Sequence, residues 1–127
     1  MSAKMSRQII VLLTAALLLA GVASGLSGGK ERPISTLGSL QEQPAIDGHI
    51  VAWADNRSGN FDIFMYDLET GTERGVSFYP GYQDHPAVSG NRIVWQDMRS
   101  GESDIYLYDY ATREEMPITT APGNQFL

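Results

Sequence analysis

One stretch of this chain occurs twice, without a gap, at an offset of 42 residues. Residues 43–68 read QPAIDGHIVAWADNRSGNFDIFMYDL, and residues 85–110 read HPAVSGNRIVWQDMRSGESDIYLYDY. The shared positions include proline, glycine, tryptophan, aspartate, arginine and tyrosine. In the first copy they are Pro44, Gly48, Trp53, Asp55, Arg57, Gly59, Asp62 and Tyr66. In the second copy they are Pro86, Gly90, Trp95, Asp97, Arg99, Gly101, Asp104 and Tyr108.

The repeat extends to both sides of this stretch. Residues 31–35, 73–77 and 115–119 share a pattern of Glu, an apolar residue and Ser or Thr, again at an offset of 42. Repeats of roughly 40–45 residues made of short β-strands are typical of β-propeller blades. We therefore expect a partial propeller over residues 31–127, with units at about 31–78 and 79–120 and the start of a third at 121–127.

Each unit contains four segments that favour β-strands. In the first unit they are residues 45–46, 49–54, 61–66 and 73–78, and in the second they are 87–88, 92–96, 103–108 and 114–119. Nearly continuous apolar runs such as Val51-Ala52-Trp53 suit a sheet covered on both faces. The predicted fold is all-β: two four-stranded antiparallel blades and an extra outer strand at 31–35, in an incomplete ring. Arg113 replaces Gly71 in one turn, so either that turn differs or the arginine adopts a costly left-handed conformation.

The N-terminus has the pattern of a secretory signal. Lys4 and Arg7 precede the uncharged residues 9–23, and small residues follow at 23–25. We predict a signal peptide at 1–25, or an uncleaved hydrophobic anchor helix, and then a linker at 26–30. The remaining chain is expected outside the cytoplasm: secreted, periplasmic or on the cell surface. Ser27 fits a G-x-S-x-G pattern but lacks the strand–turn–helix context that a nucleophile needs.

Composition limits the chemistry. The chain has no cysteine, which excludes disulfides and thiolate metal sites. Its net charge is −6, and it becomes more negative if the signal peptide with its two cations is removed. Such a surface repels phosphate backbones, so we expect no nucleic-acid partner.

Acidic side chains at the turns are weak calcium candidates. Oxygen-bearing residues recur around the turn between the second and third strands of each unit; they are Asp55, Asn60 and Asp62, and Asp97, Glu102 and Asp104. The alternative is structural: Asp55 and Asp62 pair with Arg57 and cap the hairpin. Repetition favours this alternative, because structural residues recur in every blade whereas a unique site need not. We expect no metal and no cofactor.

Other candidate residues point more to structure than to chemistry. His49 and His85 have no partner pattern for metal binding or catalysis, and surface or turn positions are expected. The aromatic residues of the strands could stack on sugars, but their recurrence favours packing between blades; they are Trp53, Phe64, Tyr66, Trp95, Tyr106 and Tyr108. Asn56 begins a glycosylation sequon on a predicted turn.

These motifs resemble the TolB-like, WD-repeat-like β-propeller repeat. Its pattern is an apolar strand ending in an aromatic residue, an Asp-x-Arg-x-Gly turn, and then Asp-Ile-Tyr with a Tyr-Asp turn. The style "PAI-x-G" before "VW-x-D-x-R-x-G-x-x-DIY-x-YD" is similar to repeats in surface proteins of methanogenic archaea. The resemblance covers about residues 31–127 and implies a fold rather than an activity.

Two classes of function follow. The first is an exported, non-enzymatic propeller that serves as an interaction scaffold for an unknown protein or envelope component, touching the membrane only through its N-terminal segment. The second is the N-terminal propeller part of a prolyl-oligopeptidase-like peptidase or a polysaccharide lyase whose catalytic part lies elsewhere. Since propellers close with four to eight blades, the chain is expected to be a fragment of a longer propeller. The alternatives are a ring assembled from several chains through exposed blade faces, and a degenerate fragment with no function of its own.

Overall fold

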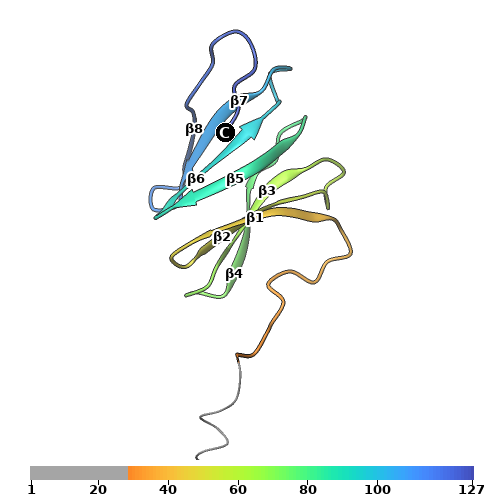
Figure 1. The fold of residues 1–127 in the computed structure, drawn as a ribbon, viewed down its shortest axis with the longest axis vertical. Helices are drawn as coiled ribbons and strands as arrows, with labels where there is room; N and C mark the ends of the chain where they lie inside the picture. The colour runs from red at the N-terminus through yellow and green to blue at the C-terminus, as the bar shows by residue number, and fades with distance from the viewer. Residues whose placement is uncertain (1–28) are drawn as a thin grey trace, which may run out of the picture. The chain divides into compact units, whose positions relative to one another are not determined.

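The computed structural model describes residues 29–127, and the predicted signal peptide and Ser27 lie outside the described residues. Ile34–Leu127 form one compact unit. It contains two four-stranded antiparallel sheets, each with its strands in sequence order (Figure 1). Blade 1 consists of β1 (Gln41–Asp47), β2 (Ile50–Asp55), β3 (Asp62–Asp67) and β4 (Thr72–Ser77). Blade 2 consists of β5 (Gln83–Ser89), β6 (Arg92–Asp97), β7 (Asp104–Asp109) and β8 (Glu114–Pro117). The predicted all-β fold is confirmed. Within residues 29–127, no helix has the length and apolarity to cross a membrane.

The first strand of each blade is longer than predicted. β1 begins at Gln41 and β5 at Gln83, and both contain a β-bulge before the apolar residues that marked the expected strands. Gln43 and His85 lie in the bulges with φ of 54° and 51°. The left-handed region normally favours glycine, so the sequence gives no signal for these bulges.

The predicted outer strand at 31–35 is not formed. A β-strand needs a partner for its backbone groups, and none of the eight strands pairs with this segment. Its equivalent in blade 1, β4, pairs along β3. The last strand of blade 2 is also shorter than predicted: β8 ends at Pro117, although the amides of Ile118 and Thr119 still donate to the carbonyl of Ile105.

Each blade has two faces because side chains alternate along a strand. The front face is defined by Val51, Trp53, Phe64 and Tyr66 in blade 1 and by Ile93, Trp95, Tyr106 and Tyr108 in blade 2. The back face is defined by Ile50, Ala52, Ile63 and Met65 in blade 1 and by the equivalent Arg92, Val94, Ile105 and Leu107 in blade 2. The main core forms where the back face of blade 1 packs on the front face of blade 2.

Candidate functional site

The shared aspartate and arginine of blade 1 form one polar network with its tryptophan. The Asp55 carboxylate is fully buried and accepts hydrogen bonds from the Trp53 indole N–H at 3.1 Å and from the Arg57 guanidinium at 2.5 Å. Arg57 also donates to Glu73 on β4, and its guanidinium carbon lies 3.9 Å from the centre of the Phe64 ring. The arginine therefore ties the turn after β2 to the last two strands of its sheet.

Blade 2 repeats this network and adds a link to blade 1. Asp97 accepts from Trp95 at 2.9 Å and from Arg99 at 2.5 Å. Arg99 also donates to Glu115 at 2.7 Å and to the Ser77 hydroxyl of blade 1 at 3.1 Å. Its guanidinium carbon lies 3.5 Å from the centre of the Tyr79 ring, in the segment that joins the blades. Arg99 thus connects the turn after β6 to β8 of its own sheet and also connects blade 2 to blade 1.

The electrostatics of these groups favour permanent ion pairs. Burial alone would raise the pKa of Asp55, but hydrogen bonds from Arg57, Trp53 and Ser39 hold that pKa well below its usual range. Burial would lower the pKa of Arg99, but the bonds to Asp97 and Glu115 outweigh it and raise the pKa. Neither group exchanges a proton near neutral pH, so the network is suited to structure rather than to acid–base catalysis.

The second aspartate of each turn has a different partner from the one expected. Asp62 accepts a hydrogen bond from the Ser58 hydroxyl rather than from Arg57, and Asp104 accepts from Ser100 at 2.9 Å. Burial raises the pKa of Asp62. No group of three or more His, Asp or Glu side chains in the described part of the chain is arranged to hold a metal ion.

The remaining candidates lie apart from one another. The His49 ring lies 3.9 Å from Glu69, whereas the His85 ring lies 3.0 Å from Asp84. Trp53 and Trp95 are buried, which leaves little ring surface for a sugar. Asn56 is half-buried, and its side-chain oxygen accepts the Leu40 amide at 2.9 Å; its glycosylation stays a prediction.

The structure also brings together residues that the repeat did not single out. The Tyr110 hydroxyl of blade 2 donates to Asp67 of blade 1 at 2.7 Å, and this bond lowers the pKa of Asp67 to about 2. The Gly90 amide donates to Asp47 at 2.7 Å. These bonds join different blades, and each has one partner at a position where the two copies differ. Tyr110 stands where the first copy has Leu68, and Asp47 stands where the second copy has Ser89.

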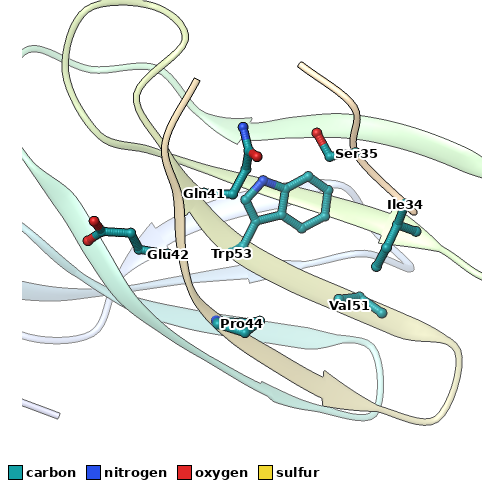
Figure 2. Close-up of a pocket in the computed structure, with 7 residues that line it drawn as sticks. All are labelled: Ile34, Ser35, Gln41, Glu42, Pro44, Val51 and Trp53. Atoms are coloured by element: carbon teal, nitrogen blue, oxygen red, sulfur yellow. The ribbon is translucent and has the colours of Figure 1, made fainter. Parts of the chain in front are cut away.

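A small pocket opens on the front face of blade 1. It has a volume of about 220 Å³ and is lined by Ile34, Ser35, Gln41, Glu42, Pro44, Val51 and Trp53. Figure 2 shows the Trp53 ring between Val51 and the Ile34–Ser35 segment. Ligand pockets usually measure about 300–1,000 Å³ and combine apolar walls with convergent polar groups. This pocket is smaller, and its mostly apolar wall continues the front face of the sheet.

Three exposed aromatic residues lie in the segment between the blades, and a fourth, Phe126, lies near Leu127. Phe78, Tyr79 and Tyr82 are 60%, 47% and 55% exposed. The equivalent positions after blade 2 are Thr120, Ala121 and Asn124, so the aromatic character belongs to this one junction. We call these three residues the aromatic junction.

Comparisons with known proteins identify the fold. No family model and no curated protein sequence matches the chain. Among solved structures, a putative TolB from Agrobacterium tumefaciens is similar with 26% identity and a TM-score of 0.58, over 74% of this chain and 35% of that one. TolB from Acinetobacter baumannii is similar with 22% identity and a TM-score of 0.61, over 75% of this chain and 25% of that one.

Propeller domains of peptidases are similar as well. The β-propeller domain of the Trilobed protease from Pyrococcus furiosus shares 20% identity with a TM-score of 0.51, over 64% of this chain and 27% of that domain. The chain spans about a third or less of the length of these structures. Together with the two sheets and their shared core, the comparisons show that residues 34–127 have the fold of two blades of a TolB-like β-propeller.

Proposed function

We propose that the chain is exported and serves as a non-enzymatic interaction scaffold at the cell envelope. The observation that carries the proposal is that the side chains shared by both blades differ in their contacts from those found in only one. The shared polar residues are engaged inside the blades, as Asp55 and Arg57 are, whereas the aromatic junction is exposed and unique to one position. Aromatic side chains are enriched in protein interfaces, where they supply much of the binding energy.

Export rests on the N-terminal pattern. A charged start, an uncharged run and small residues at 23–25 are what secretion requires. Expression of the full chain with a C-terminal tag, followed by intact-mass measurement, tests this part. A mass that lacks residues 1–23 or 1–25 in an extracytoplasmic fraction supports export, whereas a cytoplasmic chain that retains Met1 contradicts it.

Photo-crosslinking from the aromatic junction tests the scaffold. A photoreactive phenylalanine at Tyr82 in the exported chain is expected to give a discrete adduct with one envelope protein. The same probe at Thr112, which is exposed on a turn of blade 2, is the control and should give none. If neither the Tyr82 probe nor one at Phe78 yields a discrete adduct, this surface is not a partner site.

The similarity to propeller domains of peptidases favours a second candidate. The chain is similar to part of an acylaminoacyl peptidase with 16% identity and a TM-score of 0.52, over 66% of this chain and 14% of that one. In this alternative the blades belong to a peptidase or lyase whose catalytic domain lies outside residues 29–127. The reading frame downstream of Leu127 distinguishes the candidates, because further blades alone support the scaffold and a nucleophile-bearing α/β domain supports the peptidase. The resemblance to surface proteins of methanogenic archaea stays a prediction.

A further inference from the structure

The front faces of the two blades differ in what covers them. Blade 1 covers the front face of blade 2, where Trp95 is 0% exposed and Pro86 is buried. Pro44 is the equivalent of Pro86 at the offset of 42, and it is exposed beside the pocket at Trp53 (Figure 2). Among residues 34–127, the front face of blade 1 therefore lacks the neighbouring sheet that its equivalent has. Two residues from outside the sheet pack there: Ile34, as its equivalent Val76 does in the main core, and Phe78, whose ring contacts Phe64.

The back faces differ in the complementary way. In blade 1 the back face receives blade 2, and Ile50, Ala52, Ile63 and Met65 are each 0–1% exposed. In blade 2 the equivalent Val94 and Leu107 are only half-buried and Arg92 is exposed. The back face of blade 2 is therefore equivalent to the surface on which a front face packs inside this chain, but it is more exposed.

Gln125 repeats the hydrogen bonds that Gln83 makes at the start of β5. The Gln125 amide donates to the Ser103 carbonyl at 2.6 Å, as the Gln83 amide of β5 donates to the Phe61 carbonyl at 2.8 Å. The side chains of both glutamines also donate to two carbonyls of the preceding segment. Residues 123–127, which we call the tail, therefore hold the place of a first strand on the back side of blade 2.

We propose that a second copy of this chain docks head to tail at this place. Its β1 replaces the tail of the first copy, and its front face packs on the back face of blade 2. Leu107 of the first copy then enters the pocket beside Trp53 of the second copy, because Met65 and Trp95 share the main core at the equivalent positions. Residues 34–127 of each copy contribute two blades to this assembly, in which the contact between copies repeats the contact between the blades of one copy. This inference stands whether or not the scaffold function does.

Three substitutions make this contact weaker than the one inside the chain. In the docked pair, Arg92 stands where Ile50 stands on the back face inside the chain, and Phe78 stands where Thr120 stands beside the front face. Leu68 stands where Tyr110 stands, so the hydrogen bond that Tyr110 donates to Asp67 has no equivalent in the docked pair. Phe78 packs against Phe64, with ring centres 5.4 Å apart, and has to shift when a second copy docks.

The first test restores one of these residues. Arg92→Ile is expected to lower the dissociation constant of the complex between two copies on the order of tenfold or more, because docking then buries an apolar side chain in place of an exposed charge. Sedimentation equilibrium in a mild detergent measures the constant, and Arg92→Lys is the control. Asn124→Ala removes the bond from the tail to the Ser103 amide, at 2.9 Å, and is also expected to strengthen association. If neither Arg92→Ile nor Asn124→Ala changes the mass distribution, the proposed surface is wrong.

The second test fixes the direction of docking. The chain has no cysteine, so introduced thiols are the only ones. Inside the chain the His85 amide donates to the Gln43 side-chain oxygen at 2.6 Å, and in the head-to-tail pair His85 of one copy meets Gln43 of the next. A mixture of Gln43→Cys chains with His85→Cys chains is therefore expected to form disulfide-linked dimers under a mild oxidant, and each variant alone should form few.

The double variant Gln43→Cys/His85→Cys is the internal control, because its thiols lie close within one chain. If the double variant forms its intramolecular disulfide while the mixture yields no more dimer than the single variants, head-to-tail docking is excluded. Efficient dimers of Gln43→Cys alone would show a symmetric contact instead and would also overturn the proposal.

Discussion

Arg113 occupies a backbone conformation that its equivalent leaves to glycine. Its φ is 63°, close to the 68° of Gly71, and both amides donate to the carbonyl of the residue four positions earlier. The left-handed conformation costs an L-residue about 1–2 kcal/mol, and the greater freedom of unfolded glycine offsets about 0.4–1 kcal/mol of that cost. Arg113→Gly should therefore raise the free energy of unfolding by about 0.5–1 kcal/mol, measured by urea denaturation. Gly71→Ala is the matched variant and should destabilise; a stabilising Gly71→Ala would contradict the strain argument.

The two arginines of the polar networks should differ in their contribution to stability. Both bridge two carboxylates, but Arg99 also donates to Ser77 and lies over Tyr79. Lysine cannot reproduce this planar, forked geometry. We expect Arg99→Lys to lower the free energy of unfolding by about 2 kcal/mol or more, and by more than Arg57→Lys does. Equal losses in parallel denaturation curves would mean that the contacts of Arg99 to blade 1 are energetically neutral.

The bond between Tyr110 and Asp67 gives a pH-dependent link between the blades. The folded pKa of Asp67, about 2, is lower than the unfolded value of about 3.9. Its contribution to stability is therefore present above about pH 4 and is lost as the pH falls towards 2. Tyr110→Phe should raise the pKa of Asp67 towards the unfolded value, followed by the carboxyl carbon shift in NMR titration. Tyr108→Phe, which removes a hydroxyl from the same strand end, should leave that pKa unchanged; an unchanged pKa in Tyr110→Phe would contradict the assigned cause.

Residue roles were predictable from the sequence only where they recur. The pairing of Asp55 with Arg57 follows from a shared motif, and the network in blade 2 repeats it. The partner of Asp62 was not predictable, because Ser58, Asn60 and Arg57 all lie within reach of that turn and the choice depends on side-chain geometry. The bond between Asp67 and Tyr110 was missed because it joins residues that occupy different positions in the repeat.

At the scale of the elements, β1 and β5 offer a controlled comparison. They have the same length, the same bulge and the same register with the following strand. They differ in cover, because β5 lies against β1 and β2 of blade 1 whereas β1 is exposed along most of its length. The amides of β5 should therefore exchange with deuterium about tenfold more slowly than their equivalents in β1. Hydrogen exchange with mass spectrometry on dilute protein measures this; equal rates would show that contact between blades adds no protection.

The strands themselves were largely predictable, and their ends were not. The apolar runs of β2, β3, β6 and β7 place the central strands within a few residues. The outer strands depend on pairing partners rather than on their own composition. Residues 31–35 and 73–77 share one pattern, yet only the second segment has a strand beside it and becomes β4. The starts of β1 and β5 depend on bulges at Gln43 and His85, which adopt a positive φ that is uncommon outside glycine.

At the scale of the whole molecule, the two blades should behave as one cooperative unit. The main core takes side chains from both sheets, so the back face of blade 1 and the front face of blade 2 are buried against each other. Polar contacts between the blades reinforce this core, among them Arg99 with Ser77 and Tyr110 with Asp67. A repeat protein whose neighbouring units share such an interface loses both units together, because each unit alone is marginally stable.

The two tryptophans make this cooperativity measurable. Trp53 lies in blade 1 and Trp95 in blade 2, and the chain has no other tryptophan. In Trp53→Phe the fluorescence reports on blade 2, and in Trp95→Phe it reports on blade 1. Each substitution also removes a hydrogen bond to the buried aspartate of its blade, so the midpoints of the two variants will differ from each other.

The comparison must therefore be made within each variant, between the remaining tryptophan and the far-ultraviolet circular dichroism of all eight strands. We expect the two urea transitions to coincide in Trp53→Phe and again in Trp95→Phe, because blade 1 cannot keep its back face buried once blade 2 unfolds. A fluorescence transition at lower urea than the dichroism transition in either variant would show a blade that unfolds independently. The interface between the blades would then contribute less than the contacts within each sheet. In that case a second copy docking through the same kind of interface would have little stability to gain.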